Sequence, residues 1–231
     1  MKAVAFENRE FYRLIPSRFP PVSVYEGLVA NDRLGELAEA ENRTNPRLQA
    51  KARLLQAYPD SSSPKLQNWN LAPFKYINPE GSRFFGPTRP ALELADGPQT
   101  ALAVAAARRQ IFLLRTKEPP TGLDMRMLRR PVTGQFIDFR DYPIGLSRDE
   151  RWKLGSSLDS GVDGVIFHPP ERPSATCVAV LRGDALGTVI QTVHYRFVWN
   201  GERISTIYSF DEEGKELLPE ELRGPDDTLA A

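Results

Sequence analysis

Residues 78–109 read NPEGSRFFGPTRPALELADGPQTALAVAAARR, and this stretch decides how the rest of the chain is interpreted. A Gly-Ser turn near its start presents Arg83, and a short strand, ALELA, follows it. A run of strong helix formers then predicts about three turns of helix, for which Thr100 is a suitable N-cap. A catalytic site on this frame is expected to carry a carboxylate near the start of the helix, yet residue 104 is a valine.

The pattern of the sequence changes after this helix. From Leu123 onward apolar and polar residues alternate or form short buried runs, which predicts strands at LDMRML, QFIDFRD, DGVIFH and TCVAVL and two long strands in TVIQTVHYRFVWNGERISTIYSF. Asn200-Gly201 lies between the last two strands and is a strong signal for a hairpin turn. The segment SRDERWKLGSSLDSG predicts a helix that ends near Gly161. Helices early in the chain and a mostly antiparallel sheet later predict an α+β fold.

A chain of 231 residues suits a single domain, and we assign residues 1–210 to it. Within this domain, residues 31–58 carry leucines at helical spacing on both sides of a proline. This pattern predicts two short helices, which form a helical insertion or lid. Acidic residues dominate residues 211–231, which predicts a solvated C-terminal tail.

Charge and hydropathy exclude several classes of protein. Thirty Lys and Arg residues balance thirty Asp and Glu residues, so the molecule as a whole has no field that attracts nucleic acid. Basic residues are nevertheless concentrated in residues 103–130, which favours an anionic ligand. No apolar run approaches the ~18 residues that cross a bilayer, and charged residues occur near the N-terminus. We expect a soluble, cytoplasmic protein without direct contact to nucleic acid or membrane.

Candidate metal ligands are few. The one cysteine, Cys177, lies in an apolar run that predicts a buried strand, and the two histidines have no spacing that suits zinc. No metal is therefore expected. His194 lies in an alternating strand and is interpreted as structural. His168 follows the end of a strand, where loops carry function, and is a candidate to line a pocket.

Arginines are the most informative residues. Arg13 follows an aromatic pair in the otherwise apolar FYRLIP, so we expect a partner to hold its guanidinium. Arg83 stands between the turn and Phe84, which suits a pocket where a guanidinium binds phosphate and a phenylalanine stacks on a flat ring. Arg18, in SRFPP, is a third candidate. The alternative is a structural ion pair with an acid of the core.

Seven blocks of sequence together resemble one protein family. The blocks are FYRLIPSRFPP, TNPRL, NPEGSRF, QTALA, EPPTGLDMRML, GVDGVIF and TCVAVLRGDAL. In this order and at these distances they resemble the RES-domain family, particularly its longer bacterial branch, over about residues 11–203. The resemblance implies a fold similar to ADP-ribosyltransferase toxins and NAD⁺ as the substrate. It also implies a toxin–antitoxin pair in which a helix-turn-helix (Xre-type) antitoxin occludes the site.

Compared with the family residue by residue, this sequence retains two arginines of the site and lacks three of its polar groups. The arginines of the family fall on Arg13 and Arg83. The glutamate of its helix falls on Val104, a serine after the DGVIF block falls on Pro169, and an arginine two residues later falls on Glu171.

Other residues are placed to replace these groups. Glu93 stands near the position of a tyrosine that is usual in the preceding strand, and period two sets it opposite its two leucine neighbours, facing solvent or a pocket. Glu171 is a second carboxylate within reach, and Ser174 offers a hydroxyl from the same loop. The resemblance and the residues together predict Arg13, Arg83 and Glu93 as catalytic residues, and Arg13, Arg18, Arg83, Phe84, His168 and Ser174 as residues that bind NAD⁺.

Several functions stay open. The leading hypothesis is a toxin that transfers ADP-ribose from NAD⁺ to a protein and so arrests growth, because loss of polar groups impairs activation of water or phosphate more than capture by a protein nucleophile. One alternative is a glycohydrolase or phosphorylase that depletes NAD⁺. Another is a catalytically inactive RES-like binding protein, which Val104 and Pro169 favour. The last is an unrelated α+β enzyme for another nucleotide.

Overall fold

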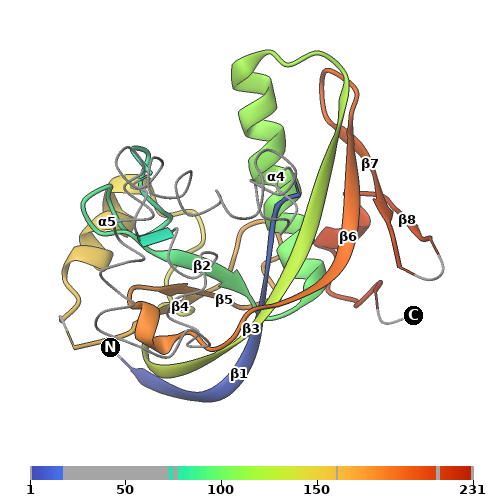
Figure 1. Cartoon of the computed structure of the whole chain (residues 1–231). Helices are drawn as coiled ribbons and strands as arrows, with labels where there is room; N and C mark the ends of the chain where they lie inside the picture. Colours follow the sequence, from blue (N-terminus) through green and yellow to red (C-terminus); the bar gives the residue numbers. More distant parts are fainter. Residues whose placement is uncertain (1, 18–72, 75–77, 160, 212–213, 230–231) are drawn as a thin grey trace, which may run out of the picture.

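The computed structural model describes residues 2–17, 73–74, 78–159, 161–211 and 214–229. Within these ranges the chain forms one domain with an eight-stranded, mostly antiparallel sheet and two α-helices (Figure 1), which confirms the α+β prediction. The strands are β1 (Ala3–Pro16), β2 (Leu92–Ala95), β3 (Thr121–Asp138), β4 (Gly164–Phe167), β5 (Cys177–Val180), β6 (Ile190–Trp199), β7 (Ile204–Ser209) and β8 (Glu216–Leu217). The helices are α4 (Pro98–Thr116) and α5 (Arg148–Ser156), with short 3-10 helices η3 (Gly183–Ala185) and η4 (Glu221–Arg223).

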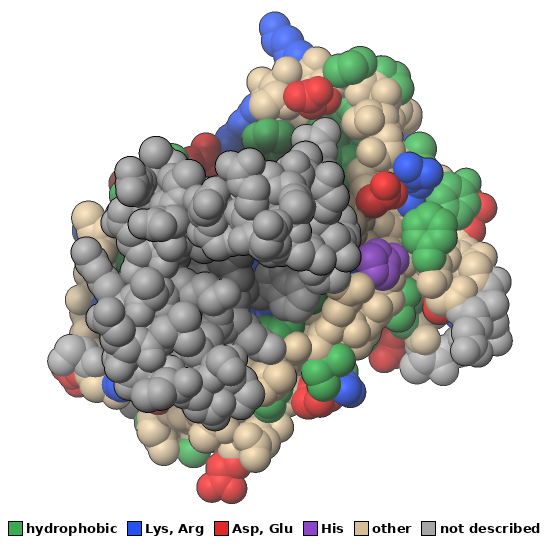
Figure 2. Space-filling model, in the orientation of Figure 1, with side chains coloured by type: hydrophobic (Ala, Val, Ile, Leu, Met, Phe, Trp, Pro, Cys, Tyr) green, Lys and Arg blue, Asp and Glu red, His purple; other side chains and the backbone are tan. Residues whose placement is uncertain are grey.

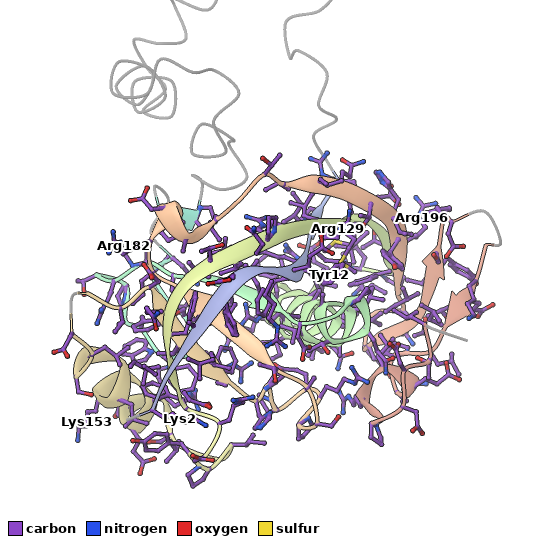
Figure 3. The ribbon with its side chains drawn as sticks, turned by 90° about the horizontal axis from the view of Figure 1, so that it is seen from below. Lys2, Tyr12, Arg129, Lys153, Arg182 and Arg196 are labelled. Atoms are coloured by element: carbon purple, nitrogen blue, oxygen red, sulfur yellow. The ribbon has the colours of Figure 1, made fainter. Side chains whose placement is uncertain are left out.

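The sheet runs in the order β1-β2-β5-β4-β3-β6-β7-β8, and β1 also pairs with β3 along most of its length. Strands β1, β2, β5, β4 and β3 therefore close into a ring. Figure 3 shows the two long strands side by side, with Tyr12 of β1 close to its register partner Arg129 of β3. A buried cluster takes side chains from all five strands, as expected for residues that point into the ring. Its strand members are Phe6, Phe11, Leu92, Leu94, Val132, Phe136, Ile166, Val178 and Val180.

The short strands β4 and β5 are buried along their whole length. Ile166 and Val178 belong to the ring cluster, whereas Phe167 and Cys177 belong to a larger cluster that includes α4. A strand covered on both faces reads as a continuous apolar run, as GVIF and TCVAV do. The predicted burial of Cys177 in a strand is confirmed, with 4% exposure.

Helix α4 packs on β1 and β2 and contributes its apolar side to the larger cluster. It begins at Pro98, after the N-cap Gly97, so the prediction of Thr100 as N-cap is wrong. Proline suits the first helical position because its φ is preset and its missing N–H needs no partner there. Thr100 is fully buried, and its hydroxyl accepts a hydrogen bond from Nη1 of Arg172 at 3.1 Å.

Helix α5 begins where the sequence predicts and ends earlier. Ser147 and Glu150 form a capping box at its N-terminus. The helix ends at Ser156 rather than near Gly161, since glycine and serine are poor helix formers at this end. The predicted strand LDMRML and the first four residues of the predicted strand QFIDFRD belong to the single strand β3, which ends at Asp138. The hairpin turn at Asn200-Gly201 between β6 and β7 is confirmed.

The C-terminal segment packs against α4. Leu217 and Leu222 are buried in the larger cluster. Gln99, which is 1% exposed, donates through Nε2 to the carbonyl oxygens of Leu222 and Asp226 at 3.2 and 3.0 Å. Its Oε1 accepts the N–H of Thr228 at 2.8 Å. The expectation of a solvated tail is therefore wrong for this segment, because Leu217 and Leu222 are buried while the neighbouring acidic side chains remain exposed.

Some sequence predictions fall on other parts of the chain. The helical insertion or lid at 31–58 and Arg18 lie outside the described residues.

Neither described α-helix is long and apolar enough to cross a membrane. Nor do the described residues gather three His, Cys, Asp or Glu side chains that suit a metal ion. On the face shown in Figure 2, the described basic, acidic and hydrophobic side chains are interspersed.

Candidate active site

A cavity of about 280 Å³ lies between β1, β2 and α4. This volume is slightly below the range for small-molecule sites, roughly 300–1,000 Å³. The described charged residues of its lining are Arg13, Arg83, Glu93, Arg108 and Arg109. The uncharged lining includes Tyr12, Val104, Phe112, Met125, Phe167, Pro169 and Cys177. Four guanidinium groups against one carboxylate, set in a partly apolar wall, suit an anionic ligand that carries a flat ring.

The turn that presents Arg83 is held from behind by α5. Gly81 has a φ of +69°, which side chains with a Cβ rarely adopt, and a Cβ there would lie 2.8 Å from the ring of Trp152. Nε1 of Trp152 donates to the carbonyl oxygen of Ser82 at 3.0 Å. Nε of Arg151 donates to the carbonyl oxygen of Arg83 at 3.0 Å. The place of Arg83 in the cavity wall therefore depends on α5.

Glu171 orients the guanidinium of Arg83. Nη2 of Arg83 donates to both carboxylate oxygens, at 2.8 and 3.0 Å, and each of the two side chains is 14% exposed. Cζ of Arg83 also lies 5.6 Å from the centre of the Phe167 ring, which supports the cation from one side. The alternative of an ion pair thus holds for Arg83, but the same residue lines the cavity.

Glu93 faces the cavity rather than solvent, and its side chain is 9% exposed. Its carboxylate accepts the backbone N–H of Arg83 at 2.7 Å and forms an ion pair with Nη2 of Arg108. Burial by itself raises the pKa of a carboxyl group. The charges of Arg108 and Arg83 and their hydrogen bonds outweigh burial and lower the pKa of Glu93 from 4.5 to about 2. Glu93 is therefore ionised at neutral pH.

Arg13 carries positive charge that the cavity does not fully compensate. Burial is the main cause that lowers the pKa of Arg13 from 12.5 to about 10. The positive charges of Arg108 and Arg109 also lower this pKa, whereas the negative charge of Glu93 raises it. Burial also lowers the pKa of Arg109. Within the described part of the chain, Arg13 and Arg109 form no ion pair, whereas Arg83 and Arg108 each have one. An anion between Arg13 and Arg109 would relieve this repulsion.

The structure brings Arg13, Arg83 and Glu93 together at this cavity, from three separate segments. Val104 and Pro169 line the same cavity. The positions expected to carry a glutamate and a serine thus face the site with apolar side chains.

Three residues predicted to bind the ligand lie outside the lining. Phe84 is 5% exposed and packs against two other aromatic rings, at centre-to-centre distances of 5.0 and 5.3 Å. Nδ1 of His168 lies 2.6 Å from the carbonyl oxygen of Ala175. Ser174 is exposed. The aromatic residues that line the cavity are instead Tyr12, Phe112 and Phe167.

Sequence reasoning does not single out Arg108, Arg109 or Phe112. All three line the cavity from α4 together with Val104: Arg108 and Arg109 follow Val104 by four and five residues, and Phe112 follows Arg108 by four. Because residues three and four apart share one face of a helix, the position of Val104 was a usable signal for the two arginines.

Comparison with known proteins identifies the family. The family model for the RES domain matches residues 62–200, more than half of the chain. The chain therefore belongs to the RES-domain family, which is associated with enzymatic toxins that use NAD⁺. The match contains Arg83 and Glu93, whereas Arg13 precedes it. The chain is also similar to "Uncharacterized protein y4oC" of Sinorhizobium fredii, with 66% identity over 230 residues that cover 100% of both chains.

Proposed function

We propose that this protein binds NAD⁺ in the cavity between β1, β2 and α4, breaks the nicotinamide–ribose bond and transfers the ADP-ribose to a protein. The observation that carries the proposal is the convergence of Arg13, Arg83 and Glu93 on one cavity. Membership of the RES-domain family supports NAD⁺ as the substrate.

The arginines supply the binding energy for the pyrophosphate. A guanidinium donates two parallel hydrogen bonds to a phosphate group. Arg13 and Arg109 are available for this contact, since neither has an ion pair within the described residues. The rings of Tyr12 and Phe112 line the same cavity and provide aromatic surface for a flat base.

Glu93 supplies the charge that the reaction requires. When the nicotinamide–ribose bond breaks, its electron pair leaves with nicotinamide, which becomes neutral, and positive charge develops on the ribose. A fixed carboxylate beside the ribose stabilises that charge. The lowered pKa of Glu93, about 2, keeps this group ionised. The nucleophile of the acceptor protein then bonds to the anomeric carbon and gives its proton to solvent.

The apolar wall favours transfer over degradation. Val104 and Pro169 stand where polar groups are expected, and both line the cavity. Water and phosphate need a positioned base or donor for efficient attack, whereas a strong nucleophile on a docked protein depends on it less. Degradation of NAD⁺ by a glycohydrolase or phosphorylase is the alternative outcome of the same bond cleavage.

A second candidate function rests on the ion pairs of the site. Arg108 engages Glu93, and Arg83 engages Glu171, so both carboxylates are neutralised by neighbours. This arrangement favours a catalytically inactive RES-like protein that binds a ligand or partner without turnover.

The proposal of an active toxin includes a helix-turn-helix (Xre-type) antitoxin that covers the cavity, and it places both proteins in the cytoplasm.

The test is incubation of the purified protein with adenine-labelled NAD⁺ and a bacterial extract. Label on a protein band supports transfer, and free ADP-ribose or its phosphate supports degradation. NAD⁺ that binds in calorimetry but stays intact supports the inactive form. Arg83→Ala should reduce turnover roughly a hundredfold. Arg203→Ala is the matched control, because Arg203 is 61% exposed, pairs with Glu220 and lies outside the cavity.

Expression without a partner provides a second measurement. An active enzyme should arrest the growth of a bacterial host, and Arg83→Ala should restore growth at equal protein level. Arrest that persists in Arg83→Ala would contradict the assigned site. Harmless expression of folded wild-type protein would favour the inactive form.

A further inference from the structure

The two members of the Glu93–Arg108 ion pair differ in their exposure. The side chain of Glu93 is 9% exposed, whereas that of Arg108 is 47% exposed. Glu93 projects from β2, a strand buried between β1 and β5. Arg108 reaches the pair with a long side chain from α4. Movement of Arg108 therefore disturbs little packing, whereas movement of Glu93 would disturb the strand.

Glu93 retains a donor when Arg108 is removed from it. The backbone N–H of Arg83 donates to Oε1 at 2.7 Å, while Arg108 bonds to Oε2. Oε1 therefore stays anchored in the turn, and Oε2 becomes available to a new partner. The carboxylate keeps its position after Arg108 leaves, because the turn that holds it is fixed by α5.

Arg108 lies among other cations at the cavity. Its charge contributes to the lowered pKa of Arg13, and Arg109 is the next residue along the helix. A pyrophosphate carries two negative charges, whereas Glu93 carries one. A pyrophosphate that enters between Arg13 and Arg109 therefore competes with Glu93 for the guanidinium of Arg108.

We propose that Arg108 changes partner when the dinucleotide binds: it leaves the carboxylate of Glu93, bonds to the pyrophosphate, and so frees Glu93 to face the ribose. This inference rests on the proposed function. It explains how a site can hold a neutralised carboxylate when empty and present a free one when loaded. Arg108 then couples binding to activation, because the carboxylate is released only when the anion is in place.

Calorimetric titration of four proteins tests the exchange, with ADP-ribose and inorganic pyrophosphate as probes. The proteins are wild type, Arg108→Gln, Glu93→Gln and the double variant. Arg108→Gln should bind both probes roughly tenfold more weakly, because a phosphate contact is lost. Glu93→Gln should bind them roughly tenfold more tightly, because no ion pair must be broken first. In a protein that already carries Arg108→Gln, the Glu93→Gln change should alter affinity less than about threefold, because no Glu93–Arg108 ion pair is left to break. The difference between this change and the roughly tenfold change in the wild-type background measures the coupling of the two residues.

Kinetics separates this role from a purely structural one. Glu93→Gln should lower kcat while tightening ADP-ribose binding, and Arg108→Gln should raise KM more than it lowers kcat. Arg108→Lys should recover part of the lost affinity, since it retains the charge without the planar group.

The outcomes distinguish this inference from the proposed function. If Arg108→Gln binds pyrophosphate as well as wild type, or if the effects of the two variants are additive, the exchange is refuted even where NAD⁺ is consumed. If the cycle holds for pyrophosphate but NAD⁺ is neither bound nor cleaved, the proposed function fails and the exchange stands. Wild-type protein that is folded and binds neither probe at millimolar concentration overturns both.

Discussion

The ion pair of Glu93 makes the stability of the protein depend on pH in a direction that can be worked out. The pKa of Glu93 falls from 4.5 to about 2 on folding, against the effect of burial and because of Arg108 and Arg83. A folded pKa below the ordinary value means that the carboxylate contributes stability above about pH 4.5. That contribution is lost as the pH falls from 4.5 toward 2.

The magnitude follows from the shift in pKa. Each tenfold change in proton affinity is worth about 1.4 kcal/mol, so a fall from 4.5 to about 2 corresponds to roughly 3 kcal/mol. Arg108 is half exposed, and water screens part of its attraction, so we expect about 2 kcal/mol.

Glu93→Gln is the matching perturbation, because it removes the charge and keeps the size and an acceptor for the N–H of Arg83. Urea unfolding of both proteins between pH 7 and pH 2.5 gives the difference in free energy of unfolding at each pH. This difference should be about 2 kcal/mol at pH 6 and should fall toward zero at the acid end. Effects of other carboxylates cancel in the comparison. A difference that stays constant across the pH range would refute the electrostatic account of Glu93.

Three further changes test the supports of the site and of the fold. Gly155→Ala would place a Cβ 1.8 Å from the carbonyl oxygen of Phe84. We expect it to push α5 away from the Arg83 turn and to lower the free energy of unfolding by about 3 kcal/mol, seen as a lower melting temperature. Gly145→Ala is the control, because its Cβ meets nothing within 4 Å, and it should leave the melting temperature unchanged. Ser147→Ala removes the cap of α5 and should cost about 1 kcal/mol in urea unfolding; an unchanged midpoint would show that the cap is dispensable. Gln99→Ala removes the bonds that hold the C-terminal segment, so it should cost about 2 kcal/mol and speed amide exchange there, and exchange at the wild-type rate would contradict this role.

Local signals made several features predictable. Asn200-Gly201 predicts its hairpin because the turn needs a residue that tolerates positive φ, and Gly201 has a φ of +100°. The segment SRDERWKLGSSLDSG predicts a helix, and the structure shows that a capping box of Ser147 and Glu150 starts it. Arg83 stands out because a Gly-Ser turn precedes it, and the structure has this turn at Gly81 and Ser82.

Features that depend on distant contacts were beyond such signals. Strand β1 pairs with β3 across more than a hundred residues, and nothing local in the first residues specifies that partner. Thr100 fits the pattern of an N-cap, yet Pro98 starts the helix earlier. The pairing of Glu93 with Arg108 requires knowledge of how α4 lies on β2, since period two alone leaves Glu93 facing either side of the strand.

The most direct test of the central claim is a structure of the protein with bound ADP-ribose or NAD⁺. The account predicts the pyrophosphate within hydrogen-bond distance of Arg13 and Arg109, the ribose beside the carboxylate of Glu93, and Arg108 turned from Glu93 toward phosphate. A dinucleotide bound elsewhere, or a ribose that faces away from Glu93, would contradict it.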